Sequence, residues 1–324
     1  MGLTRLVVFL DQQVYYSGQT ISGRLVVAVD KPMSMIGLYD DLFRFADDAQ
    51  ECELAKGEHV FIFNCQLPMN LPSSFEGEHG RVRYSVKATI KRSTWKSNHD
   101  AKYPVTVMSV CDLNHIALAA SKTFWGNSKP FLMTVNLPVR GFVPGQTIPV
   151  VVSLDNESKV QVTSLTVSLV QVSTESNHFS KFEKRHVSLP KGLGSETVPI
   201  NFVLPSVPAS FLEFCRIIDV GYELNVEAKV KAWYHKNLRM HTSIIVGNIP
   251  LMNYQIPIPS QPIYREPVQE ENPSHSKTPD DLPPSYGFVV PPGTMYEDLR
   301  EYLIALLANF SPSYPVYKFD TNQG

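Results

Sequence analysis

An internal repeat is the feature of this 324-residue sequence that most constrains its fold. Three landmarks occur twice, in the same order, and the second copy is longer between its first and middle landmarks. The repeat unit is far longer than a solenoid module, so it predicts two homologous domains. The paired landmarks are Gly18–Ile21 and Gly145–Ile148, Leu67–Pro68 and Leu204–Pro205, and Tyr84–Lys91 and Tyr222–Lys231.

Short runs rich in Val, Ile, Thr, Phe and Tyr fill both copies, for example His59–Phe63 and Leu165–Val170. Several runs alternate apolar and polar residues, as half-buried antiparallel strands do. Before residue 250 we find no long stretch with helical periodicity. The fold class predicted is all-β: two tandem immunoglobulin-like β-sandwiches.

Gly18 and Gly145 open the first landmark of each copy. We predict that both occupy turn positions with positive φ, which glycine adopts without steric cost. Pro144 suits the position before such a glycine in a type II turn. A phosphate-binding role is disfavoured, because neither a lysine nor a helix start follows.

The composition changes near Pro250. Residues 250–324 hold 13 of the 25 prolines, and this last segment is also acidic. Such a segment buries too little apolar surface to offset its ordering entropy. We therefore expect a mostly disordered, proline-rich tail with one short helix over 295–309. The net charge of -2 makes nucleic acid an unfavoured partner.

The four cysteines show no CxxC spacing, and the N-terminal residues lack the pattern of a signal peptide. We expect free thiols in a reducing, cytoplasmic compartment. No run of apolar residues is long enough to predict a spanning helix. The nine histidines form no HExxH or Cys/His zinc pattern, and there is no Gly-x-Ser-x-Gly elbow. We predict neither an enzyme nor a metal or cofactor site.

The C-terminal segment contains a Pro-Pro-x-Tyr motif, Pro283-Pro284-Ser285-Tyr286. The two prolines favour a polyproline II turn, so little entropy is lost on docking. Aromatic grooves of WW domains bind such turns, and the tyrosine fills a second pocket. A proline-rich spacer is the plainer interpretation. Degenerate copies that lack the first proline, and that we rate as weak secondary sites, are Pro262 with Tyr264 and Pro312 with Tyr314.

Residues 296–310 carry an apolar stripe at helical spacing. Docking back onto the sandwiches is the use we favour for this stripe. A partner groove or a membrane surface is the alternative, but the polar face lacks lysine.

Several long motifs resemble known sequences. Val143–Pro149 resembles the start of an arrestin C-terminal domain, and Cys65–Gly77 with Val82-Arg83-Tyr84 is very similar to the N-terminal domain of the arrestin domain-containing proteins, the alpha-arrestins. Ile217–Leu224 and Ile245–Leu251 match the close of the second domain. The resemblance implies arrestin-type sandwiches packed end to end. The expected organisation is 5–111 for the first domain, 112–130 for a linker, 131–251 for the second domain and 252–324 for the tail.

The sequence departs from the family pattern between Met33 and Lys56. The family has a long strand, a turn and a further strand with a tryptophan there, and this chain is shorter. We expect a missing strand or a looser edge in the first domain. Loosely paired edges invite strand addition by a partner.

The resemblance implies an adaptor function. The sandwiches would bind cytoplasmic regions of membrane proteins, receptors or transporters, and Tyr286 would recruit a WW-containing HECT-type ubiquitin ligase. Ubiquitination, endocytosis and endosomal sorting of the cargo would follow, with the chain peripherally associated with the plasma membrane or endosomes.

Three other functions are open. A ligase-independent trafficking scaffold, like the arrestin-like subunit of retromer, has no use for the Pro-Pro-x-Tyr motif. A receptor-desensitising arrestin would carry an N-terminal lysine pair, whereas Arg5 and Asp11 flank only apolar residues here. An extracellular adhesion sandwich would need an export signal.

Overall fold

The computed structural model describes most of residues 2–254 and one C-terminal segment. The described residues are 2–35, 37–40, 43–44, 52–77, 80–92, 97–116, 123–126, 131–157, 161–173, 178–189, 196–231, 237–252, 254 and 308–317. Within them the structure is nearly all β, which confirms the predicted fold class. The named helical element is a single 3-10 turn, η1 (Leu113–His115).

The first sandwich is built from a three-stranded sheet, in the order β1-β3-β8, and a five-stranded sheet, in the order β2-β12-β11-β5-β6. Two small ribbons, β4–β7 and β9–β10, accompany them. The strands are β1 (Leu3–Leu10), β2 (Val14–Tyr16), β3 (Thr20–Val29), β4 (Met33–Met35), β5 (Gly37–Asp40), β6 (Phe43–Arg44), β7 (Cys52–Leu54), β8 (Gly57–Gln66), β9 (Phe75–Glu76), β10 (Arg81–Val82), β11 (Tyr84–Lys91) and β12 (His99–Met108).

The second sandwich pairs a four-stranded sheet, β13-β14-β16-β19, with a five-stranded sheet, β15-β21-β20-β17-β18. The strands are β13 (Thr123–Gly126), β14 (Phe131–Leu137), β15 (Gly141–Phe142), β16 (Thr147–Asn156), β17 (Val162–Ser173), β18 (His178–Ser188), β19 (Glu196–Val203), β20 (Val220–Val230) and β21 (Leu238–Val246).

The two sandwiches share one topology, as the repeat predicted. The order β2-β12-β11-β5-β6 matches β15-β21-β20-β17-β18, and β1-β3-β8 matches β14-β16-β19. Both β2 and β15 are parallel to their neighbour, whereas the other pairs in these sheets are antiparallel. Tyr84 and Tyr222, which open β11 and lie near the start of β20, thus fall on equivalent strands.

The sandwiches differ most where the sequence departs from the family. At the sheet edge, β5 and β6 have four and two residues, whereas the matching strands β17 and β18 have 12 and 11. The short segment between Met33 and Lys56 also forms the small ribbon β4–β7. Among the described residues the edge is therefore shorter than in the second sandwich, and the strands equivalent to β17 and β18 are present as the short strands β5 and β6.

Each sandwich has its own apolar core, formed by the inward residues of alternating strands. Burial along β20 alternates almost residue by residue, and the outward side of β19 is exposed. The largest buried side chains include Tyr15 and Leu25 in the first core and Phe142, Phe202 and Tyr222 in the second. Burial of this apolar area drives both domains to fold.

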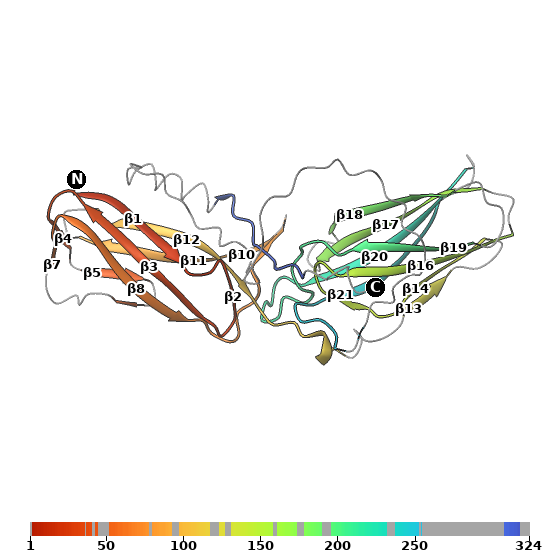
Figure 1. Ribbon diagram of the computed structural model, residues 1–324, viewed down its shortest axis with the longest axis horizontal. Coiled ribbons are helices and arrows are strands. Elements are labelled where there is room, and N and C mark those ends of the chain that lie inside the picture. The colour runs from red at the N-terminus through yellow and green to blue at the C-terminus, as the bar shows by residue number, and fades with distance from the viewer. Residues whose placement is uncertain are drawn as a thin grey trace, which may run out of the picture.

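The sandwiches lie end to end, which makes the molecule elongated (Figure 1). Residues 109–116 carry the chain from the first to the second. The expected linker 112–130 differs from the structure, because Thr123–Gly126 form β13 and pair with β14. Because residues 123–126 pair with β14, they belong to the second sandwich and not to a linker.

Candidate functional site

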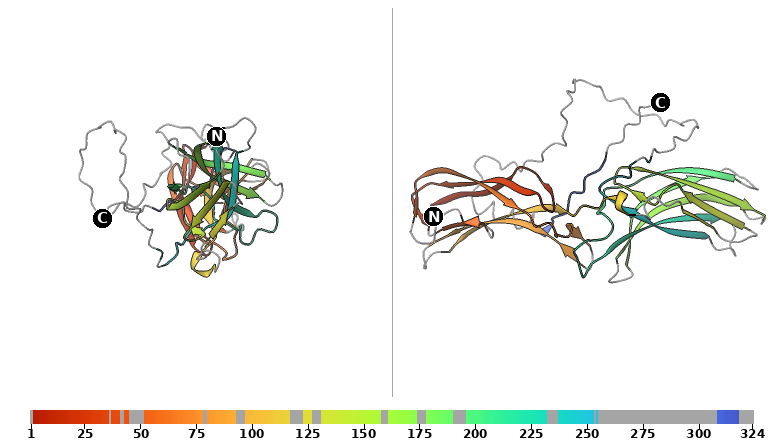
Figure 2. Two further views of the ribbon diagram at one scale, coloured as in Figure 1. Left: turned by 90° about the vertical axis from the view of Figure 1, so that its right-hand side faces the viewer. Right: turned by 90° about the horizontal axis from the view of Figure 1, so that it is seen from below.

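The candidate functional site is the seam between the two sandwiches, where the end of each domain and a C-terminal segment meet. In Figure 1 and in the right-hand view of Figure 2, the segment 308–317, coloured blue, lies at this junction. We use the name seam for the following residues: Ser74, Thr106 and 109–114 on the first sandwich, and Pro144, Gly145, Ser206 and 246–252 on the second.

A strand-connecting turn of each sandwich carries the glycines that the sequence singled out. Gly18 and Gly145 have φ of 81° and 87°, which confirms the predicted positive φ. The glutamine after each glycine closes the turn: the side-chain oxygens of Gln19 and Gln146 accept hydrogen bonds from the backbone N–H of Tyr16 and Val143, respectively. The repeated Gly-Gln pair therefore forms the same turn in both sandwiches.

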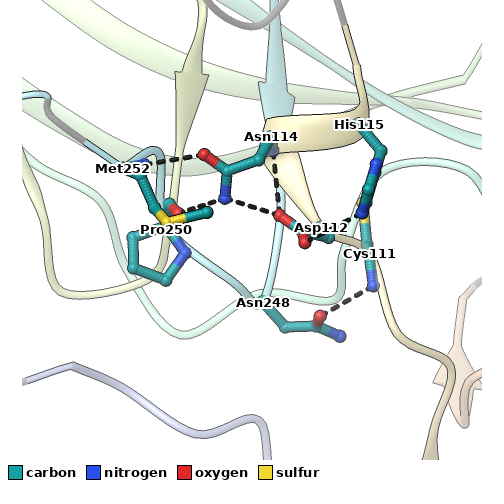
Figure 3. A network of polar contacts seen from close by, with 7 residues as sticks. All are labelled: Cys111, Asp112, Asn114, His115, Asn248, Pro250 and Met252. Carbon is teal, nitrogen blue, oxygen red and sulfur yellow. Dashed lines mark hydrogen bonds and ion pairs between the residues drawn. The ribbon is translucent and has the colours of Figure 1, made fainter.

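Asn248 joins the ends of the two domains (Figure 3). Its side-chain oxygen accepts from the backbone N–H of Cys111 at 2.7 Å, and its amide nitrogen donates to the carbonyl of Ser109 at 2.6 Å. Its own backbone N–H donates to the carbonyl of Cys111. Asn248 is buried, so loss of these partners would leave polar groups unpaired.

Asn114, in η1, also hydrogen-bonds across the seam, to the end of the second domain (Figure 3). Its side chain donates to the carbonyl of Pro250 at 2.9 Å and accepts from the N–H of Met252 at 2.7 Å. Asp112 caps η1 by accepting from the backbone and side-chain nitrogens of Asn114, and these hydrogen bonds lower the pKa of its carboxyl. His115 lies 3.5 Å from the same carboxylate.

Apolar contacts also cross the seam. Phe75 of the first sandwich lies in the core cluster of the second. Leu113 packs with Val143 and Ile245 in a small separate cluster. A Cβ at Gly247 would lie 2.6 Å from the Leu113 side chain, so glycine permits this approach. The seam therefore combines buried polar crossings with a packed apolar centre.

The C-terminal segment contacts both sandwiches. On the first, the Ser313 N–H donates to the Thr106 hydroxyl at 3.1 Å, and the Tyr314 hydroxyl donates to the Ser74 carbonyl at 3.1 Å. On the second, the Ser206 hydroxyl donates to the Tyr314 carbonyl at 2.9 Å. The Tyr317 N–H donates to the Pro144 carbonyl, and its hydroxyl donates to the Asn248 carbonyl at 2.7 Å.

Burial raises the pKa of several groups at or beside the seam, which keeps them neutral. The thiol of Cys111 has its pKa raised to about 11, mainly by burial and further by Glu213 and Asp112. Burial raises the pKa of Tyr84 to about 12. The pKa of Tyr314 is also raised, by burial and then by the charge of Glu76, whose carboxylate forms a bidentate pair with Arg83.

The structure places the predicted site residues unevenly. The principal motif, Pro283, Pro284, Ser285 and Tyr286, lies outside the described residues, as do Pro262 and Tyr264. Of the predicted helix 295–309, only its end at residues 308–309 is described. Pro312 and Tyr314 are described, and both lie in the seam, where Pro312 is buried.

Sequence reasoning missed the polar crossing of the seam. Asn248 stands in the closing motif of the second domain and Asn114 follows the first, but neither belongs to a periodic pattern. The only sequence feature that could have indicated Asn114 and Asn248 is that each lies near the end of a predicted domain. The degenerate motif with Pro312 and Tyr314 was found from the sequence, but its contacts with Ser74 and Thr106 were not.

Among the described residues, no cluster of His, Cys, Asp or Glu side chains is placed to hold a metal ion. No disulfide joins the four cysteines, all of which are described. In the part of the chain that the structure describes, no helix is long and apolar enough to span a membrane.

Comparison with known proteins assigns both sandwiches to one family. The model of the arrestin (or S-antigen) N-terminal domain matches residues 39–114, and that of the C-terminal domain matches residues 127–251. The second match begins at the end of β13. The first match runs from β5 to η1, and the second covers the second sandwich after β13, so β1–β4 and β13 lie outside both matches.

Curated proteins with similar sequences carry the same domain name. Arrestin domain-containing protein 1 of Rattus norvegicus is 25% identical over 217 residues, 62% of this chain and 49% of that protein. Arrestin domain-containing protein 17 of Caenorhabditis elegans is 24% identical over 305 residues, 75% of this chain and 69% of that protein. The human arrestin domain-containing protein 4 is 26% identical over 213 residues, 61% of this chain and 50% of that protein.

The chain thus spans about half the length of arrestin domain-containing protein 1. Two matched domains in the correct order, a shared topology and these relatives lead to one conclusion: the chain belongs to the arrestin family, among the arrestin domain-containing proteins or alpha-arrestins.

Proposed function

We propose that this chain is a non-enzymatic trafficking adaptor that recruits a WW-domain HECT-type ubiquitin ligase to membrane-protein cargo. The sandwiches bind cytoplasmic regions of receptors or transporters. The ligase then ubiquitinates the cargo, which is endocytosed and sorted in endosomes. The chain acts in the cytoplasm, peripherally associated with the plasma membrane or endosomes.

The observation that carries this proposal is the place of Pro283-Pro284-Ser285-Tyr286 in the sequence, between two segments that contact the seam. The motif lies between Tyr254 and Ala308, and the described residues on either side of this interval contact the seam. A ligase bound at Tyr286 is therefore attached to the arrestin body through both flanks. Attachment of this kind raises the effective concentration of the ligase near any cargo on the sandwiches.

The test is binding of the full-length chain to a panel of isolated WW domains by biolayer interferometry. A single WW domain should bind with a micromolar Kd, because the contact is small. The Tyr286→Ala variant should bind at least about 30-fold more weakly, corresponding to loss of about 2 kcal/mol at a central anchor. Phosphorylation of Ser285 should also weaken binding, because it adds charge and bulk beside the tyrosine pocket.

The matched control is Tyr264→Ala, which removes a tyrosine from a degenerate motif in the same segment. This variant should retain binding close to that of the unmodified chain. Equal WW binding by the Tyr286→Ala variant, or no binding by the unmodified chain to any WW domain of the panel, would reject the adaptor mechanism.

A further inference from the structure

The degenerate motif with Pro312 and Tyr314 is bound to the two sandwiches of its own chain. Tyr314 donates its hydroxyl proton to the carbonyl of Ser74 in the first sandwich, and its own carbonyl accepts from Ser206 of the second. One tyrosine therefore bonds to both domains. Pro312, two residues before it, is buried, so both recognition elements of the motif are engaged at the seam.

The seam side of this contact is built to receive the segment. Ser74 is fully buried; its backbone N–H donates to the carbonyl of Val107, and its hydroxyl accepts from the N–H of Val107. Tyr314 supplies a partner for the Ser74 carbonyl. Thr106 is 2% exposed, and its hydroxyl accepts from the Ser313 N–H. Buried polar groups need such partners, and the segment provides them.

The second sandwich also has room for the segment, at the turn that contains Gly145. A Cβ at Gly145 would lie 2.2 Å from the carbonyl oxygen of Tyr317 and 2.6 Å from the Val316 side chain. Glycine at this turn therefore does two things: it adopts positive φ, and it leaves room for the segment. Tyr317 is held there by its N–H to Pro144 and its hydroxyl to Asn248.

We propose that the seam is an intramolecular binding site for residues 312–317, and that this segment is a strap that holds the two sandwiches at one relative angle. Its contacts with Ser74 and Thr106 on one side, and with Pro144, Ser206 and Asn248 on the other, cannot all persist if the domains turn relative to each other. The strap also breaks the symmetry of the repeat, because Tyr314 bonds to Ser74 and not to the equivalent Ser210 of the second sandwich.

The strap has a consequence for ligase recruitment, and this consequence rests on the proposed function. A WW domain must insert the proline rings and the tyrosine of its ligand into its own pockets. In the strapped state Pro312 and Tyr314 already occupy the seam. The motif at Pro312 and Tyr314 is thus closed to WW domains, and recruitment relies on Pro283–Tyr286.

The first test is amide hydrogen exchange of the full-length chain, followed at Ser313 and Tyr317. Both amides donate hydrogen bonds in the strap and should exchange slowly. In the Tyr314→Ala variant both should exchange at least about tenfold faster, because the anchor that keeps them closed is removed. The Tyr264→Ala control should leave both rates unchanged. Equal rates in the Tyr314→Ala variant and the unmodified chain would overturn the proposal.

The second test supplies the strap in trans. A fluorescent peptide spanning residues 308–320 is titrated into the full-length Tyr314→Ala chain, and its anisotropy is measured. The peptide should bind this variant saturably, and bind the unmodified chain at least about tenfold more weakly, because its own segment competes at high effective concentration. Equal binding to both chains, or binding by a Tyr314→Ala peptide as strong as by the parent peptide, would contradict a specific site.

Tyr314→Phe keeps the ring and removes only the hydroxyl, so it protects the test against an unfolded Tyr314→Ala variant. It should give intermediate exchange rates at Ser313 and Tyr317. The Tyr286→Ala variant separates the two proposals: it should weaken WW binding at least about 30-fold without changing exchange at either amide. Failure of the strap therefore leaves ligase recruitment standing, and the reverse also holds.

Discussion

Tyr84 and Tyr222 make the same hydrogen bond in the two sandwiches: each donates its hydroxyl proton to a proline carbonyl, Pro72 or Pro208, at 2.8 Å. Equivalence between these tyrosines was predicted from the repeat alone. Their surroundings differ, because Tyr222 is fully buried and Tyr84 is partly exposed beside the seam.

This difference predicts unequal costs for removing the hydroxyl. Tyr222→Phe should destabilise the protein by about 1–2 kcal/mol, because the buried Pro208 carbonyl loses its partner. Tyr84→Phe should cost about 0.5–1 kcal/mol, since water can reach the site. Urea unfolding monitored by fluorescence measures both. A larger effect at Tyr84 than at Tyr222 would mean that burial does not set the cost.

The turn glycines form a second matched pair. Gly18→Ala and Gly145→Ala should each cost about 1–2 kcal/mol, because both place a Cβ at positive φ. At Gly18 the new methyl group meets the side chain of Met69, which is exposed and can move. At Gly145 it meets the Tyr317 backbone. Thermal unfolding should therefore show the lower Tm for Gly145→Ala, and equal values would argue against contact with the C-terminal segment.

Asn248 should control the connection between the domains. Asn248→Ala removes the partners of the Cys111 N–H and the Ser109 carbonyl, at a cost of about 2–4 kcal/mol for two buried polar groups. Small-angle X-ray scattering and limited proteolysis should then report separated sandwiches. Asn237→Ala is the control, because Asn237 hydrogen-bonds Glu227 within the second sandwich. The control should keep the interdomain geometry of the unmodified chain.

Stability should fall in alkaline solution. Burial raises the pKa of Cys111 from 9.0 to about 11, so the fold favours the neutral thiol. A raised pKa contributes stability that is complete below the ordinary value and is lost as pH rises through the folded value. Between pH 9 and 11 we expect a loss of roughly 1–2 kcal/mol from this thiol.

Melting curves across that pH range test the assignment to Cys111. Tyr84, whose pKa is raised to about 12, adds a further loss at the upper end of the range. Cys111→Ser replaces the titrating thiol by a hydroxyl and should flatten the decline above pH 9. A decline of the same steepness in this variant would place the titrating group elsewhere.

The shortened edge of the first sandwich shows the limit of pattern reading. The sequence predicted a missing strand or a looser edge between Met33 and Lys56, and the structure has β5 and β6 as stubs. The pattern of apolar residues located the shortened region, but the pairing of strands decided which strands form there. Pairing of β5 with β11 depends on residues far apart in the chain, which no local period encodes.

The sequence by itself determined the two all-β domains, the equivalent turns at Gly18 and Gly145, and the equivalence of Tyr84 with Tyr222. These are properties of local conformation and of a repeat, and both are written along the chain as spacing. Only the tertiary structure decided that Asn248 meets Cys111 and that Tyr314 meets Ser74. Such contacts join single residues from distant segments without any period, and they exist only once both sandwiches have folded and met.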